Sequence, residues 1–241
     1  MTGWGRMCSA GLLVTMCGVA LAQETATSIK PAPTATAKRQ VSFTFDRKGV
    51  LVSHYRLVVH DDGSGLYEGT EIPSATACGH PASDSAQPFK HVITISPATS
   101  QKIFSTAEKL NRFDVPCASK LKNIADTGTK TLMYEGSDGN GSCTYNFSEN
   151  KDVQSLTEVF QGIAETLDTG RRLDQLHRFD RLGLDAAMKA LVDEVSEGRA
   201  LEIGTIAKSL RSIASDTEVM ARVRSRASTL LSQIPAASAT E

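Results

Sequence analysis

The chain contains few aromatic residues and carries almost no net charge. Phe, Trp and Tyr make up 5% of its 241 residues, so a hydrophobic core has to be built mainly from Val, Leu, Ile and Ala. The formal net charge at pH 7 is −1, which leaves no electrostatic footprint for nucleic acid or for an anionic membrane surface. The composition therefore predicts a globular protein that binds no nucleic acid.

The sequence motifs of several enzyme classes are also missing. There is no Gly-x-Ser-x-Gly turn and no His-Glu-x-x-His helix, and the glycine-rich stretch at 136–141 has no phosphate-loop lysine. The five histidines include one close pairing with cysteine, Cys78-Gly79-His80, whereas a structural zinc site usually takes two close pairs. The sequence therefore predicts no catalytic residue, no cofactor-binding residue and no metal ligand.

Residues 1–22 have the layout of a secretory signal peptide. Arg6 precedes an apolar run at residues 11–21, and Ala20-Leu21-Ala22 forms a small-x-small cleavage site. The run is too short to cross about 30 Å of hydrocarbon as a helix, and neither cysteine of the leader follows a lipobox. We therefore expect a periplasmic or extracellular protein with no membrane span after cleavage. Loss of Arg6 changes the formal charge from −1 to about −2.

Three cysteines remain after cleavage, namely Cys78, Cys117 and Cys143. Cys143 shares a predicted strand face with Tyr145 and Phe147, and Cys117 lies in the connection just before that hairpin. In an oxidising compartment this arrangement favours a disulfide between Cys117 and Cys143, which would stabilise the fold by roughly 3 kcal/mol in the chain-entropy model. The alternative is three unpaired thiols, with Cys143 acting as a small core residue.

The hydrophobic periodicity predicts an α+β fold with elements in the order ββ-β-α-ββ-α. Helical spacing indicates one helix beginning at Ser96-Pro97 and a second from about Asp152. Alternation of apolar and polar residues indicates strands at 41–46, 52–60, 66–68, 89–95, 129–135 and 142–148. We expect an antiparallel sheet of two hairpin-rich halves with the helices on one face.

The domain organisation follows from these patterns. The predicted segments are the signal peptide at 1–22, a disordered linker at 23–40, the α+β domain at 41–170, a helical extension at 171–234 and a disordered tail at 235–241. The last two helices of the extension are loosely similar to one HEAT-type hairpin, which cannot form a solenoid by itself. We expect the extension to pack on the α+β domain or on a partner.

One stretch of the chain resembles a known family. In residues 55–69 a strand that begins with Tyr meets an Asp-Gly turn and a Tyr-x-Gly return, and Ile95-Ser96-Pro97 and Asp126-Thr127-Gly128 follow before a helix and a hairpin. Over about residues 41–170 this order resembles a family of uncharacterised exported bacterial domains. The chain departs from it at Val52-Ser53-His54, where the family has Gly-x-Cys-Pro. The family has no established activity, so the resemblance implies the fold and no site residues.

A few polar residues are candidates for interaction with a partner. The cluster His60-Asp61-Asp62 has the side chains of a catalytic or calcium-binding group, but Gly63, Ser64 and Gly65 follow it, and turn chemistry explains all of them. Two arginines flank the apolar stripe of the last helix, where they are either solvated or able to meet an acidic partner. The candidates are His54, His60, Asp62, Arg222 and Arg226.

Together these observations predict a function in binding rather than catalysis. We expect an exported, non-catalytic binding or envelope-associated module whose partner is a protein. The alternative is a hydrolytic enzyme, or an inhibitor of one, that uses the loop at 71–88, because this loop is long for an unstructured connection. The sequence predicts no oligomeric state.

Overall fold

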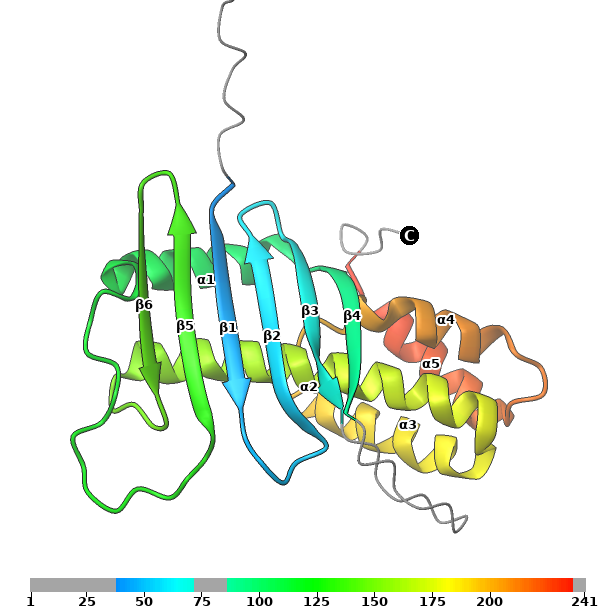
Figure 1. Cartoon of the computed structure of the whole chain (residues 1–241). Helices are drawn as coiled ribbons and strands as arrows, with labels where there is room; N and C mark the ends of the chain where they lie inside the picture. Colours follow the sequence, from blue (N-terminus) through cyan, green and yellow to red (C-terminus); the bar gives the residue numbers. More distant parts are fainter. Residues whose placement is uncertain (1–37, 72–85, 236–241) are drawn as a thin grey trace, which may run out of the picture. The chain divides into compact units, whose positions relative to one another are not determined.

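The computed structural model describes residues 38–71 and 86–235. Within these ranges six strands form one antiparallel sheet in the order β4-β3-β2-β1-β5-β6, which Figure 1 shows with α1 and α2 behind it. The strands are β1 (Gln40–Asp46), β2 (Val52–His60), β3 (Ser64–Glu71), β4 (Gln87–Thr94), β5 (Thr129–Gly136) and β6 (Gly139–Tyr145). The predicted α+β class is therefore confirmed. The predicted signal peptide, Cys78 and His80 lie outside the described residues.

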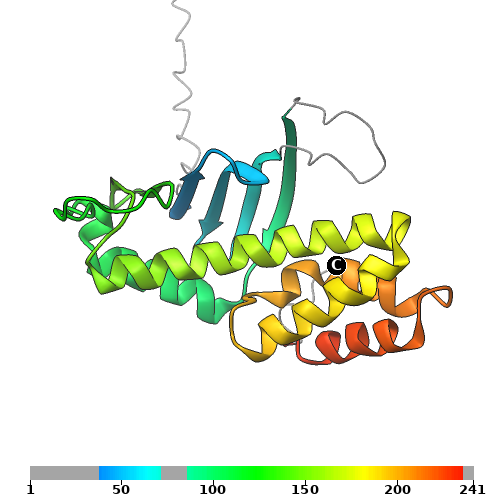
Figure 2. The ribbon, with the colours of Figure 1, turned by 90° about the horizontal axis from the view of Figure 1, so that it is seen from below.

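The core lies between the sheet and two helices, α1 (Pro97–Lys109) and α2 (Lys151–Phe179). Alternate residues of β1 and β2 point toward these helices, among them the fully buried Phe43 and Leu57, which pair directly across the two strands. The rings of Phe43 and Phe160 on α2 stack with their centroids 5.3 Å apart. Figure 2 shows both helices on the same side of the sheet, and no described helix covers its other side.

The first helix begins where the sequence predicts. Ser96 is the N-cap, its Oγ accepts a hydrogen bond from the Thr99 amide, and Pro97 is the first helical residue. The side chain of Glu202, far along the chain, also accepts hydrogen bonds from the amide and the hydroxyl of Ser96 at 2.8 and 2.7 Å. The C-terminal part of the chain is thereby joined to the start of α1.

The second helix, α2, is longer than predicted. It continues past Gly170, the residue near which the α+β domain was expected to end. It runs for 29 residues and passes through Gly170 without a break. A Cβ at Gly170 would lie 2.3 Å from Cγ2 of Ile206, which shows that this glycine permits a close approach between two parts of the chain. The sequence does not distinguish such a glycine from one that ends a helix.

Three further helices follow α2, of which the first and second pack on α2 and the third packs on the other two. They are α3 (Arg181–Ser196), α4 (Ala207–Ser215), preceded by a 3₁₀ turn at Ile203–Ile206, and α5 (Ala221–Ser232). Their buried residues, such as Leu184, Leu210 and Val223, belong to the same hydrophobic cluster as the residues beneath the sheet. The predicted boundary at 170 therefore falls inside one continuous core, and the helices of 171–234 pack on the α+β part as expected.

The hairpin of β5 and β6 is tighter than predicted. Pairing continues up to Gly136 and Gly139, so the turn consists of Ser137 and Asp138 instead of the six residues 136–141. A Cβ on Gly141 would lie 2.3 Å from the carbonyl oxygen of Arg112, which follows α1 in a 3₁₀ turn at Asn111–Phe113. Gly141 is therefore a strand residue whose missing side chain lets the 3₁₀ turn pack closely. The glycine-rich composition of this stretch is why the predicted turn was too long.

The predicted disulfide is present. Cys117 and Cys143 are bonded with their Cα atoms 5.8 Å apart, and both side chains are buried. The bond attaches the irregular segment that follows α1 to β6, the last strand of the sheet. A backbone hydrogen bond of 2.9 Å from the Ser119 amide to the Phe147 carbonyl continues this attachment.

Candidate functional site

Two of the predicted interaction residues lie on the uncovered face of the sheet. His54 and His60 are on β2, where the intervening Tyr55, Leu57 and Val59 are buried toward the helices. Because side chains alternate along a strand, both histidines point to the opposite face. The Nδ1 atom of His60 is buried there and has no hydrogen-bond partner among the described residues.

A groove on this face extends from His54 across three strands. Its volume is about 510 Å³. It is lined by residues of β2, β3 and β4, namely His54, Arg56, Glu68, Gly69, Thr70, Pro88, Phe89 and Lys90. Thr70 and Pro88 lie next to the ends of the loop predicted to be functional, but residues 72–85 of that loop are outside the described ranges.

The charges of this groove are only partly balanced. Arg56, Glu68 and Lys90 are paired in register across β2, β3 and β4. The Lys90 Nζ atom lies 3.9 Å from Oε2 of Glu68, whereas Arg56 has no ion pair or side-chain hydrogen bond within the described ranges. At the groove's end, Nδ1 of His54 lies 2.6 Å from Oδ1 of Asp46. One positive charge is therefore left for a ligand.

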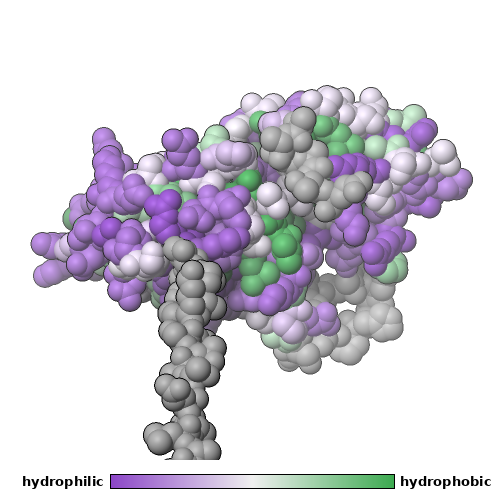
Figure 3. Space-filling view, turned by 90° about the horizontal axis from the view of Figure 1, so that it is seen from above, coloured by the Kyte–Doolittle hydropathy of each residue, from purple (hydrophilic) through white to green (hydrophobic). Residues whose placement is uncertain are grey.

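A row of apolar side chains borders the groove. Val58, Leu66 and Val92 are paired across β2, β3 and β4, one row beyond the charged residues. Val58 is 7% exposed, whereas Val92 on the edge strand is 85% exposed, so the row reaches the surface at the edge of the sheet. Figure 3, seen from above, shows hydrophobic residues in small patches near the middle of the view, with hydrophilic residues around them. The charged groove thus lies beside an apolar row that is exposed at the edge strand.

Asp62 has the turn role that the sequence indicates. It lies between β2 and β3 and accepts hydrogen bonds from the amide and the hydroxyl of Ser64 at 3.0 and 2.6 Å. It also forms an ion pair with Lys38. These contacts, that with Lys38 foremost, hold the pKa of Asp62 well below its usual range. Its oxygens are thus occupied by residues of the same chain.

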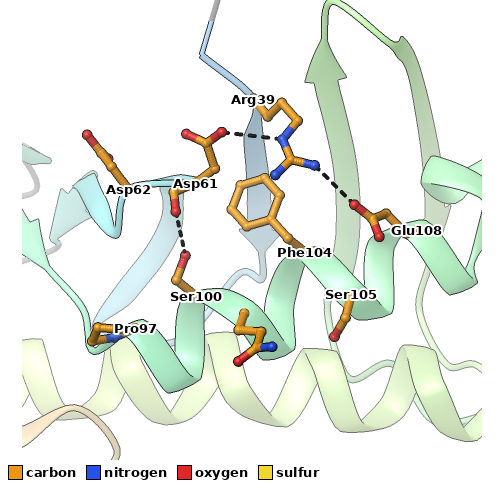
Figure 4. A pocket seen from close by; sticks show the side chains of 9 residues that line it. Arg39, Asp61, Asp62, Pro97, Ser100, Phe104, Ser105 and Glu108 are labelled. Carbon is orange, nitrogen blue, oxygen red and sulfur yellow. Dashed lines mark hydrogen bonds and ion pairs between the residues drawn. The ribbon is translucent and has the colours of Figure 1, made fainter.

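Next to Asp62 is a smaller groove of about 360 Å³, shown in Figure 4. Arg39 lies between two carboxylates, with Nε 3.3 Å from Asp61 Oδ2 and a terminal nitrogen 3.0 Å from Glu108 Oε1. Its guanidinium carbon is 5.5 Å from the centre of the Phe104 ring. Because this one arginine is shared by two carboxylates, it connects β1 to α1, and the lining of the groove keeps an excess of negative charge.

The two arginines of the last helix meet an acidic partner inside the chain. Arg222 and Arg226 on α5 both bind the carboxylate of Asp185 on α3, at 2.8 and 2.7 Å. Both arginines are thus paired within the chain, and the side chain of Arg222 remains 62% exposed. They are far along the chain from His54 and His60, and the predicted candidates do not converge on one site.

Sequence reasoning missed a network of charged residues between α2 and the sheet. The Tyr67 hydroxyl donates to Asp168 Oδ1 at 2.9 Å, and Arg171 lies 2.9 Å from the same oxygen. Arg171 also pairs with Glu71 and stacks on Phe89, with 3.8 Å from its guanidinium carbon to the ring centre. The only sequence signal is the i, i+3 spacing of Asp168 and Arg171 on a helix.

A cavity of about 630 Å³ opens beside this network. Burial raises the pKa of Asp168 to about 6, against the hydrogen bond from Tyr67, which lowers it. Burial and the nearby Glu194 also raise the pKa of Glu165, which lines the same cavity. Raised carboxyl pKa values occur in active sites. Oδ1 of Asp168 is, however, engaged by both Tyr67 and Arg171, which suits a structural role.

Comparisons with known proteins assign no family to the chain. No protein-family model matches the chain, and no curated protein matches it. Within residues 38–71 and 86–235, no three His, Cys, Asp or Glu side chains are grouped so that they could hold a metal ion. In the same ranges no helix has the length and apolar character needed to cross a membrane.

Proposed function

We propose that the chain is an exported, non-catalytic binding module that engages a protein partner through the uncovered face of its sheet. The observation that carries this proposal is the groove of about 510 Å³ next to an apolar row that ends at the exposed Val92. Exposed apolar surface rimmed by polar residues is typical of interaction sites. The predicted signal peptide and the Cys117–Cys143 bond support export, because disulfides persist in oxidising compartments.

The groove's chemistry defines the partner segment that fits. Arg56 lacks a carboxylate partner in the described part of the chain, and Lys90 shares only Glu68 at 3.9 Å. A segment with a carboxylate near Arg56 and an apolar side chain against Val92 would satisfy both features. An arginine that is not already paired is well suited to such recognition because its planar guanidinium binds a carboxylate with two parallel hydrogen bonds.

Site-specific crosslinking tests this proposal. A photo-crosslinking amino acid is placed at Val92, and, as a control on the same face, at the exposed Thr144 of β6. In the exported fraction we expect a crosslinked protein from position 92 only. Arg56→Glu should abolish the crosslink, whereas Arg211→Glu, the same charge change on exposed α4, should not. No crosslink from position 92, or equal yields from 92 and 144, would contradict the proposal.

The Asp46–His54 pair favours hydrolysis as a second candidate function. A carboxylate on Nδ1 orients a histidine so that Nε2 can act as a general base, and Thr70 is paired opposite His54 in the sheet. The wild-type protein should then hydrolyse one of a panel of ester, peptide and glycoside substrates, and His54→Ala and Asp46→Asn should remove that activity. If the wild type turns over none of them, this candidate is eliminated.

A further inference from the structure

A second cavity, on the helix-covered side of the sheet, contains a buried lysine. Lys130 is 6% exposed and is the one charged residue in the buried class within the described ranges. Its Nζ atom donates to Asn146 O and Thr127 Oγ1 at 2.9 Å, to Gly128 O at 3.1 Å and to Thr127 O at 3.3 Å. These acceptors are all uncharged, and no described carboxylate lies within ion-pair distance of Nζ. The positive charge is hydrogen-bonded but not neutralised.

A second cation lines the same cavity of about 520 Å³. Arg47 lies in the turn after β1, and within the described ranges its guanidinium forms no ion pair or hydrogen bond. Burial lowers the pKa of Lys130, and the charge of Arg47 lowers it further because the two cations repel each other, whereas the carboxylate of Asp126 acts in the opposite direction. Glu158 is the only acidic side chain that lines the cavity. Among the residues that line the cavity, positive charges therefore exceed negative charges by one.

Neutral groups complete the cavity. The Gln161 amide lines the wall and has no hydrogen-bond partner in the described part of the chain, while Phe147, 38% exposed, adds an apolar surface. The first-turn amides of α2 are already bound by Asn150, so the helix terminus contributes nothing free. Burying an unneutralised charge is costly, and an anion placed beside it lowers that cost.

We propose that this cavity binds a small oxyanion, a carboxylate or a phosphate, between Arg47 and Lys130. Arg47 at the exposed side binds two of its oxygens, and Lys130 at the base attracts it by charge, while the three ammonium protons stay with their acceptors on Thr127, Gly128 and Asn146. Gln161 donates to a remaining oxygen. This site differs from the sheet-face groove and does not depend on the function proposed for it.

The purified oxidised protein is titrated with sodium phosphate and, separately, with sodium acetate, with sodium chloride held at matched ionic strength. Thermal unfolding and calorimetry measure binding. We expect saturable binding of at least one anion and a rise of the melting temperature that sodium chloride does not produce. Binding of phosphate alone identifies a phosphate ligand, and binding of acetate alone identifies a carboxylate ligand.

Two matched variants decide whether the cavity is responsible. Arg47→Gln should weaken binding about tenfold, the loss of roughly one charge-assisted contact. Lys48→Gln removes the same charge from the adjacent exposed residue, which does not line the cavity, and should leave binding unchanged. No saturable binding of either anion, or an equal loss in both variants, would overturn the proposal. Both substitutions are at exposed positions, so folding is preserved.

Discussion

Removing the Cys117–Cys143 disulfide should lower the free energy of unfolding by about 3.5 kcal/mol. The bond joins residues separated by 26 positions. In the chain-entropy model the entropy lost by the unfolded chain is 2.1 cal/mol/K plus 1.5R times the logarithm of the loop length, which for this separation is about 12 cal/mol/K, or about 3.5 kcal/mol at 25 °C. Both cysteines are buried, so each is replaced by alanine. Serine would place a hydroxyl without a hydrogen-bond partner in the core.

The position of the bond predicts a local effect as well. The segment around Ser119 lies along β6, an end strand of the sheet, and is held there by the disulfide and by the hydrogen bond to Phe147. Without the disulfide this segment should open more often than the centre of the sheet. Amide hydrogen exchange should therefore accelerate more in β6 than in β1.

Urea unfolding followed by circular dichroism measures the global effect. The only tryptophan, Trp4, lies in the predicted signal peptide, so the mature protein has no tryptophan fluorescence to follow. Reductant should shift the wild type to the stability of the double variant and should leave the variant itself unchanged. A difference below about 1 kcal/mol between oxidised wild type and variant would refute the loop-entropy reasoning, and so would an equal response of both to reductant.

Three further changes test other parts of the fold by thermal or urea unfolding. Gly170→Ala should destabilise by about 1–3 kcal/mol despite alanine's higher helix propensity, because its Cβ would meet Cγ2 of Ile206, and the same change should cost less in an Ile206→Ala background, which lacks that atom. Asn150→Ala should cost about 1 kcal/mol, as it removes the N-cap of α2. Asp168 has a pKa of about 6 in the fold, raised above its unfolded value of 3.8, so it contributes stability that is full below pH 3.8 and is lost as the pH rises through 6. Asp168→Asn should abolish that pH dependence and be at least as stable as the wild type at pH 8. If the variant were much less stable than the wild type at pH 8, the ion pair with Arg171 would outweigh the cost of burying the carboxylate.

The strands, the first helix and the disulfide could be predicted because their signals are local. Alternating residues define β1 and β2, Ser96-Pro97 defines the start of α1, and the position of Cys143 on a core-facing strand favours its bond to Cys117. The length of α2 could not be predicted in the same way. Gly170 faces Ile206, which is distant in sequence, so its purpose is a tertiary contact that periodicity does not reveal.

In the candidate site, too, local patterns could be predicted, whereas contacts between residues distant in sequence could not. His54 and His60 share a face because their spacing along β2 is even, and the sequence pattern is sufficient for that. The partner of Arg222 is Asp185, 37 residues away, and the partner of Tyr67 is Asp168, 101 residues away. Only the folded chain brings such pairs together, so sequence reasoning had no basis for separating an internal ion pair from a free charge.

That separation of internal from free charges supports both proposed sites. Arg39 and Arg171 line cavities, but each binds two carboxylates of the chain and so stabilises the packing of a helix on the sheet. Arg56 and Arg47 also line cavities, yet neither forms an ion pair with a described carboxylate. Removing a paired arginine leaves its carboxylates without a partner and should lower the free energy of unfolding. Removing Arg56 or Arg47 leaves no carboxylate unpaired. Loss of binding with unchanged stability in Arg47→Gln, and in Arg56→Gln as the neutral counterpart of Arg56→Glu, is therefore the pattern that distinguishes a recognition residue from a structural one.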